Sequence, residues 1–180
     1  VELQVRAVGL NFRDVLNVLG EYPGDPGPPG SDCAGVLAAP AVRGGAFGYG
    51  FSPLASVSRT DSRLLASKPC ALSFEAVVTL PVTWSTVYAC LSRAQLAAGK
   101  AQLIHAAAGG VGLKAVEYAQ ELQAGVTLAT AGNRHKHGQL KNIGLVSLGS
   151  SRDPGATAYG GSWQLYCKRV HGVLNSLSHN

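Results

Sequence analysis

A glycine-rich segment in the middle of the chain has the residue types of a phosphate-binding turn. Residues 104–112 read Ile-His-Ala-Ala-Ala-Gly-Gly-Val-Gly, between a short apolar run at 102–104 and a stretch compatible with a helix. A tight strand-to-helix turn needs small residues, and a helix N-terminus offers N–H groups and partial positive charge to a pyrophosphate. The alternative is an ordinary glycine-rich turn, because the spacing is not G-x-G-x-x-G. We favour a cofactor site formed by Ala108, Gly109, Gly110, Val111 and Gly112.

The flanking sequence supports a strand, helix and strand in succession. Val116, Ala119 and Leu122 recur at helical spacing within 111–122, with charged residues between them. This pattern predicts an amphipathic helix lying on a sheet. Gly125 follows the helix, and residues 126–130 are apolar enough for a buried parallel strand.

The residues after that second strand are basic and include no carboxylate. An NAD site commonly places Asp or Glu there to bind the ribose 2′-hydroxyl, whereas residues 131–137 read Ala-Gly-Asn-Arg-His-Lys-His. Arg134 or Lys136, beside Gly132, would instead attract a 2′-phosphate, which favours NADPH over NADH. The alternative is a solvated, charged helix start.

Composition restricts the function classes. The chain has 180 residues, of which 46% are hydrophobic and 14% charged, so it is globular but short for a complete two-domain enzyme. It contains no Met and begins in an alternating, strand-like pattern, so we expect a fragment excised from a longer polypeptide. We recognise no apolar run long enough to span a bilayer and no secretory signal, and we expect a cytoplasmic protein without a membrane partner.

Charge and cysteine content point to neither nucleic acid nor structural metal. The net charge of +5 is dispersed, so no nucleic-acid partner is required. Cys33, Cys70, Cys90 and Cys167 are scattered without a C-x-x-C pair, which argues against a zinc ribbon or a disulfide framework. We expect four buried thiols.

The N-terminal half predicts a strand at 1–8, a helix within 9–20 that ends at a glycine, a Pro- and Gly-rich loop at 21–30, and a strand at 31–37. The chain should cross to a second domain near 72–95. Ser73 could cap a helix there, and Pro81 could break or start one.

Five segments together resemble the successive motifs of enoyl reductase domains in polyketide and fatty acid synthases, which belong to the medium-chain dehydrogenase/reductase superfamily. They are residues 9–15 (Gly-Leu-Asn-Phe-Arg-Asp-Val), 22–24 (Tyr-Pro-Gly), 105–112, 150–153 (Ser-Ser-Arg-Asp) and 173–177 (Val-Leu-Asn-Ser-Leu). The resemblance implies an α/β fold with a Rossmann-type parallel sheet at 73–180, preceded by a partial GroES-like β-barrel at 1–72. The barrel is shortened between residues 37 and 66, and the C-terminal part of the family fold is missing.

The same resemblance implies an activity and further site residues. The family reduces an α,β-unsaturated acyl thioester carried by an acyl carrier protein, using NADPH, beside neighbouring synthase domains. Lys136 and Asp153 match positions considered as proton donors, Tyr22 lies beside the expected cleft, and Arg152 and Asn175 fall in cofactor-binding motifs. No metal ligands are expected, because residues 30–35 contain no His or Glu where zinc-dependent relatives need them. A free-standing NADPH quinone or enone reductase and a degenerate, non-catalytic scaffold or nucleotide-binding remnant remain as alternatives.

Overall fold

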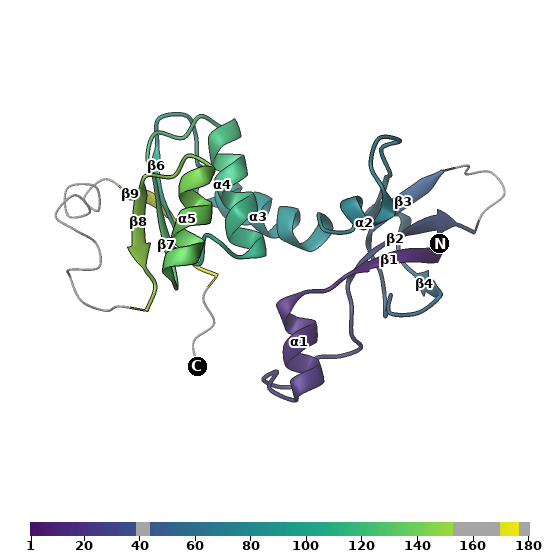
Figure 1. Ribbon diagram of the computed structural model, residues 1–180. Coiled ribbons are helices and arrows are strands. Elements are labelled where there is room, and N and C mark those ends of the chain that lie inside the picture. The colour runs from purple at the N-terminus through teal and green to yellow at the C-terminus, as the bar shows by residue number, and fades with distance from the viewer. Residues whose placement is uncertain (39–43, 153–169, 177–180) are drawn as a thin grey trace. The chain divides into compact units, whose positions relative to one another are not determined.

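The computed structural model describes residues 1–38, 44–152 and 170–176. They form two compact units, Val1–Ser85 and Thr86–Asn180 (Figure 1). The division falls within helix α3 (Pro81–Arg93), later than residue 72 and inside the stretch 72–95 where the crossing was expected. The domain boundary at residue 72 in the whole protein stays a prediction.

The first unit is built on a five-stranded antiparallel sheet in the order β4-β1-β2-β3-β5. Its strands are β1 (Glu2–Gly9), β2 (Asp32–Leu37), β3 (Gly45–Tyr49), β4 (Val57–Arg59) and β5 (Leu65–Ser67). Successive residues of a strand point to opposite faces, so the neighbours Cys33 and Ala34 belong to different apolar clusters. Cys33 packs with Leu3 and Ala46, and Ala34 lies in the cluster of Val77 and Val78. Strand β2 is therefore buried on both faces.

This sheet corresponds to the partial barrel expected from the sequence. The pairings run from β4 through β1, β2 and β3 to β5, and among the described residues none joins the two edge strands. Two short helices accompany the sheet, the 3-10 helix η1 (Ser62–Leu64) and α2 (Phe74–Val77). The cap predicted at Ser73 is confirmed, because its hydroxyl accepts the Ala76 N–H at 3.1 Å. Helix α3 begins at Pro81, where a helix start was expected.

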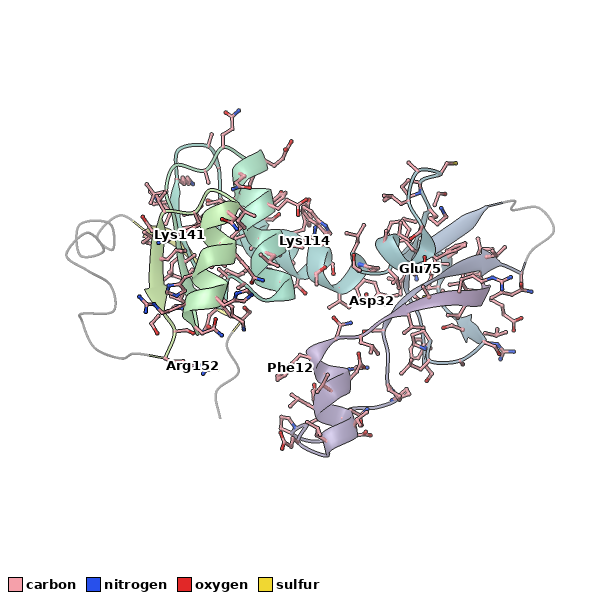
Figure 2. The ribbon with its side chains drawn as sticks, in the orientation of Figure 1. Phe12, Asp32, Glu75, Lys114, Lys141 and Arg152 are labelled. Carbon is pink, nitrogen blue, oxygen red and sulfur yellow. The ribbon has the colours of Figure 1, made fainter. Side chains whose placement is uncertain are left out.

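Helix α1 (Phe12–Leu19) is held to the first unit by polar contacts. Asn11 and Asp14 form a reciprocal capping box, and Gly20 ends the helix in the left-handed conformation. Asp14, the one buried residue of α1, also accepts the Gly30 N–H at 2.7 Å. Phe12 is exposed, and Figure 2 shows its side chain at the surface of the first turn. Asn11 and Asp14 thus have a structural role at the start of α1.

The second unit contains a four-stranded parallel sheet in the order β8-β7-β6-β9. Its strands are β6 (Ala101–Ile104), β7 (Thr127–Ala131), β8 (Ser147–Ser150) and β9 (Val170–Leu174), and α4 (Gly110–Glu121) and α5 (Arg134–Asn142) connect the first three. The chain moves outward from β6 to β8 and then returns to the other side of β6. Ligands bind open α/β sheets at such a reversal, beyond the carboxyl ends of the strands.

The predicted strand, helix and strand around the glycine-rich turn are confirmed. The helix expected at 111–122 occupies Gly110–Glu121, and the strand expected at 126–130 occupies Thr127–Ala131. Val116 and Ala119 are buried on the helix face that packs on the sheet. Helical periodicity located α4 because its buried apolar residues recur along one face of the helix.

A helical stretch at the junction of the two units corrects the expectation about apolar runs. Residues Phe74–Arg93, which run from the start of α2 to the end of α3, form a stretch of 20 residues with mean hydropathy 1.3, long and apolar enough to cross a membrane by length and composition alone. The sequence-based prediction missed this stretch because it divides at Pro81, where α3 begins. Val77, Val87 and Leu91 within the stretch are buried in apolar clusters of the fold.

The prediction of four buried thiols is wrong for two of them. Cys33 is buried, but Cys70 and Cys90 are exposed. Cys70 lies in the loop before α2, and Cys90 lies on α3 beside the buried stripe of Val87 and Leu91 rather than within it. Cys167 lies outside the described residues.

Candidate functional site

The turn from β6 to α4 has the close backbone packing expected of a phosphate cradle. Gly109 is the N-cap of α4, and its N–H donates to the Ala106 carbonyl at 2.8 Å. Ala106 adopts a left-handed conformation, with φ of 49°. The first backbone N–H groups of an α-helix have no acceptor within the helix. Those of Gly110, Val111 and Gly112, in the first turn of α4, are therefore positioned as a group that can bind an anion.

Gly112 allows the helix to approach the turn. A Cβ atom at this position would lie 2.6 Å from the Ala107 Cα and would also clash with the Ala106 carbonyl oxygen, and both are backbone atoms that cannot move aside cheaply. A Cβ at Gly109 would lie 3.2 Å from the same oxygen. The glycines at 109 and 112 therefore have a packing reason, which the sequence pattern alone left open.

The N-terminus of α5 forms the second side of the site. The Asn133 side chain caps the helix by accepting the Lys136 N–H at 2.9 Å. The imidazole of His137 lies 3.1 Å from the Ala131 carbonyl, through its Nε2. These contacts fix the backbone of the first turn of this short, polar helix, which includes Lys136.

Arg152 forms the third side, just after β8. Its N–H donates to the Ser150 hydroxyl at 3.2 Å, and the neighbouring Ser151 N–H donates to the Ala131 carbonyl at 3.2 Å. The Arg152 side chain lies over Gly132, since a Cβ at Gly132 would be 3.1 Å from its Nε. Figure 2 shows Arg152 at the carboxyl end of β8.

These three segments enclose a pocket of about 280 Å³ at the carboxyl edge of the parallel sheet. It is lined by Ala106, Ala108, Gly109, Ala131, Gly132, Lys136, Ser151 and Arg152. Its lining consists of small residues together with one lysine and one arginine. A pocket with backbone donors and two cations suits an anionic ligand that carries phosphate groups.

The structure brings together five of the cofactor-binding residues expected from sequence, namely Ala108, Gly109, Gly132, Lys136 and Arg152. Arg134 is the first residue of α5 but does not line the pocket, and Asn175 follows β9, the neighbour of β6. Asp153 lies outside the described residues, and Tyr22 is half-buried in the loop after α1 in the first unit.

Sequence reasoning missed three lining residues, Ala106, Ala131 and Ser151. Ala106 and Ala131 have no functional group that a pattern could single out. Ser151 stood within the motif 150–153, which gave the only available signal for it.

His105 directly follows β6 and contacts Thr130. Burial lowers the pKa of its imidazole below the ordinary value, which favours the neutral form. Its Nδ1 lies 3.1 Å from the Thr130 hydroxyl. These contacts suit a structural role for His105.

Two polar side chains near the sheets, Asp32 and His171, serve ordinary hydrogen bonds. The buried Asp32 accepts hydrogen bonds from Asn11 Nδ2 at 2.9 Å and from the Val82 N–H at 2.8 Å. His171 accepts the Ala101 N–H at 3.1 Å through its Nδ1. Within residues 1–38, 44–152 and 170–176, no group of three His, Cys, Asp or Glu side chains is arranged to hold a metal ion.

Comparison with known proteins identifies relatives of two kinds. The chain is 43% identical over 165 residues to the erythronolide synthase EryA2 of Saccharopolyspora erythraea, covering 86% of this chain and 4% of that protein. The CurK enoyl reductase is similar in structure, with a TM-score of 0.83 and 33% identity over 99% of this chain and 59% of that one. No family model matches the chain.

A quinone oxidoreductase of Thermus thermophilus, solved also in complex with NADPH, has a TM-score of 0.68 and 33% identity over 83% of this chain and 50% of its own. The chain thus spans less than two thirds of each of these three relatives. Its fold, its glycine-rich turn and these similarities agree. The chain belongs to the medium-chain dehydrogenase/reductase superfamily, in the group that contains polyketide synthase enoyl reductases and quinone oxidoreductases.

Proposed function

We propose that this chain is the nucleotide-binding part of an NADPH-dependent enoyl reductase domain in a polyketide synthase. The observation that carries the proposal is the pocket in which Gly109, Gly132, Lys136 and Arg152 meet. The glycines leave room for a pyrophosphate beside the backbone, and the two cations match a 2′-phosphate. The relationship to EryA2 and to the CurK enoyl reductase supports the substrate class.

The proposed reaction reduces the carbon–carbon double bond of an acyl thioester held on an acyl carrier protein. The nicotinamide supplies a hydride to the β-carbon, and a proton is added to the α-carbon. In this chain the glycine-rich turn and Arg152 hold the nucleotide. Residues that bind a reactant increase the reaction rate mainly by holding it in the reactive orientation. Lys136, Asp153 and Tyr22 remain proposed catalytic residues, and water is the alternative proton source. Carrier protein, neighbouring synthase domains and a cytoplasmic location belong to the same proposal.

Lys136 has two proposed roles, and its position favours one of them. Its backbone is fixed in the first turn of α5, next to the end of β7, and its side chain lines the same pocket as Arg152. This is where the ribose edge of a dinucleotide lies in the fold. We therefore assign Lys136 to the 2′-phosphate in preference to proton transfer. Asp153 is then the remaining side-chain acid to test.

A second function is favoured by one observation. The Thermus thermophilus quinone oxidoreductase is as similar in sequence to the chain as the CurK enoyl reductase is, at 33% identity for both. A free-standing quinone or enone reductase would use the same nucleotide pocket. A non-catalytic remnant would retain nucleotide binding at most.

The deciding experiment measures NADPH oxidation by the full-length protein with a crotonyl thioester and, separately, with 1,4-benzoquinone. Turnover of the thioester alone supports the enoyl reductase, and turnover of the quinone alone supports the alternative. Nucleotide binding without turnover of either substrate identifies the remnant. A protein that binds neither NADPH nor NADH contradicts both reductases and the nucleotide-binding remnant, because each of them uses the pocket, and it is consistent only with a non-catalytic scaffold.

A further inference from the structure

Thr130 contacts three consecutive residues of the glycine-rich turn. It is fully buried on β7. Its Oγ1 lies 3.1 Å from His105 Nδ1 and 3.3 Å from the Ala106 nitrogen, and its carbonyl accepts the Ala107 N–H at 2.9 Å. A single strand residue thus binds the part of the turn that precedes the phosphate-binding glycines.

The middle residue of these three, Ala106, has a strained backbone. Its φ is 49°, a conformation that L-residues other than Asn and Asp seldom adopt. Ala106 lines the pocket, and its carbonyl accepts the N–H of Gly109, the N-cap of α4. An extended Ala106 would turn this carbonyl away and release the first turn of the helix. The conformation must therefore be stabilised by its surroundings.

The hydrogen bonds of the Thr130 hydroxyl also favour one placement of the protons, which we infer as part of the proposal below. A hydroxyl has one hydrogen and two lone pairs. The Ala106 N–H occupies one lone pair, and His105 Nδ1 is the acceptor within reach of the hydroxyl hydrogen. His105 is then neutral, with its own proton on Nε2. Burial of the imidazole, which lowers its pKa, is consistent with the neutral form.

We propose that Thr130 is a positioning residue of the nucleotide site, which holds Ala106 in its left-handed conformation and thereby orients the pyrophosphate-binding turn. This proposal rests on the proposed function, since it concerns the same pocket. The role proposed for Thr130 differs from that of Lys136 in the part of the ligand that each residue affects. Thr130 acts on the turn that faces the pyrophosphate, which NADPH and NADH share, whereas Lys136 faces the 2′-phosphate, which only NADPH has.

The test compares Thr130→Val with Thr130→Ser in the full-length protein. Valine keeps the shape of the side chain but removes the hydroxyl, which leaves the partly buried Ala106 N–H without its acceptor. We expect the dissociation constants of NADPH and NADH to rise by the same factor, about 3- to 30-fold. Thr130→Ser should bind both nucleotides within about twofold of the wild-type protein, because it keeps the hydroxyl.

A second substitution separates positioning from a general loss of structure. Glycine adopts a positive φ without strain, so Ala106→Gly should restore most of the nucleotide affinity that Thr130→Val removes. Unchanged affinity in a folded Thr130→Val variant would overturn the proposal. So would an effect on NADPH alone, or a loss that Ala106→Gly leaves unaltered.

The wild-type protein supplies an independent measurement that does not depend on how the variants fold. The nitrogen-15 shifts of His105 should report an unprotonated Nδ1 and a protonated Nε2 at neutral pH. A proton on Nδ1 would overturn the assignment of the hydroxyl hydrogen, because the hydroxyl would then accept from both His105 and Ala106, and the positioning role would be decided by the Thr130 and Ala106 variants. Failure of the wild-type protein to bind either nucleotide would instead overturn the proposed function, so the two failures are distinct.

Discussion

At the scale of single residues, backbone and side chains contribute different properties to the pocket. The turn after β6 contributes shape, whereas Lys136 and Arg152 contribute charge from α5 and from the end of β8. The two cations are supported differently. Lys136 belongs to a capped helix turn, and Arg152 rests on Gly132. Discrimination between NADPH and NADH should therefore depend on side chains that can be removed without changing the turn.

Lys136→Ala gives the sharpest test of this division. Loss of a charge-assisted contact to a phosphate costs about 1.5–3 kcal/mol, so the Michaelis constant for NADPH should rise roughly 10- to 150-fold. Turnover with NADH should change little, because NADH has no 2′-phosphate. Steady-state kinetics of the full-length protein with both nucleotides measures the two effects.

Lys141→Ala is the matched control, since Lys141 lies on the last turn of the same helix and does not line the pocket. It removes the same charge and should leave both Michaelis constants unchanged. If Lys136→Ala lowers the turnover number equally with NADPH and NADH, the lysine serves proton transfer instead. Its assignment to the 2′-phosphate would then be wrong.

Asp32 is a residue whose contribution depends on pH. Burial raises the pKa of its carboxyl above the ordinary value, the hydrogen bonds from Asn11 and Val82 oppose this, and the nearby Asp14 adds to the increase. The folded protein therefore holds this proton more tightly than the unfolded chain. The stability that this proton contributes is fully present below the ordinary pKa and is lost as pH rises through the folded value.

Asp32→Asn should remove that pH dependence. The free energy of unfolding of the wild-type protein minus that of the variant is expected to fall as pH rises from below the ordinary pKa of an aspartate. Taking the difference cancels the other carboxylates, which both proteins share. Urea denaturation at a series of acidic pH values measures it. A difference that grows with pH would mean that the Asn11 and Val82 hydrogen bonds outweigh burial.

At the scale of elements, four helices end in the same way but with different residues. In each, one residue in the left-handed conformation ends the helix and donates its N–H to the carbonyl three residues earlier. The next residue donates its N–H to the carbonyl five residues before itself, which completes a Schellman motif. The left-handed residues are Gly20 after α1, Gln95 after α3, Gln123 after α4 and Gly144 after α5. Two helices thus use glutamine where glycine has no steric cost.

Gln123→Gly should stabilise the protein. The substitution removes the strain of a left-handed glutamine, and after allowance for the greater freedom of glycine in the unfolded chain we expect about 0.5–1 kcal/mol. The backbone bonds of Gln123, to the Gln120 carbonyl and from the Gly99 N–H, need no side chain. Thermal or urea denaturation provides the measurement.

The control is the same substitution at Gln139, an exposed position inside α5. There Gln→Gly should destabilise the protein, by about 0.5–1 kcal/mol, because glycine is a poor helix former. Opposite signs at the two positions are the expected result. A loss of stability at position 123 as well would show that the left-handed conformation of Gln123 is not strained.

The sequence predicted the elements better than the contacts between them. The spacing of apolar residues located α4 and β7, because in each element this spacing depends only on residues close together in the sequence. The contact of Arg152 with Gly132 joins segments that meet only through the pairing of β7 with β8. The contact of Thr130 with the turn depends on the register between β6 and β7. The register between strands that are distant in sequence cannot be predicted from local spacing. The sequence therefore indicated Arg152 and Gly132 without the contact between them, and it gave no role to Thr130.

Local patterns also account for the residues that were assigned wrongly or left open. A cysteine is on average a buried residue, but exposure of Cys70 and Cys90 depends on the loop and the helix face that they occupy. The glycine pattern indicated a phosphate turn without identifying which glycine is required for packing. The Cβ contacts at Gly112 answer that question.

At the scale of the whole molecule, the two units have separate apolar cores. The core of the second unit joins Val87 and Leu91 of α3 to residues of β6, α4, β7 and β9. The clusters of the first unit lie around Leu3 and Ala34. The pocket that we propose binds nucleotide is lined entirely by residues of the second unit. A ligand stabilises the structure that it binds, so nucleotide should act first on this core.

We therefore expect NADPH to slow hydrogen exchange unequally along the full-length protein. At a concentration about 100 times its dissociation constant, a ligand stabilises the bound structure by about 2.7 kcal/mol. Amides of β6 and β7 that exchange by unfolding of the second unit should then exchange about 100-fold more slowly. Peptides from β1 and β2 should change much less, because their cores do not include pocket residues. Equal protection of both sets would show that the two units unfold together. In that case the division into two cores describes packing but not cooperativity, and the α3 helix, which has residues in both units, would be the connection to test next.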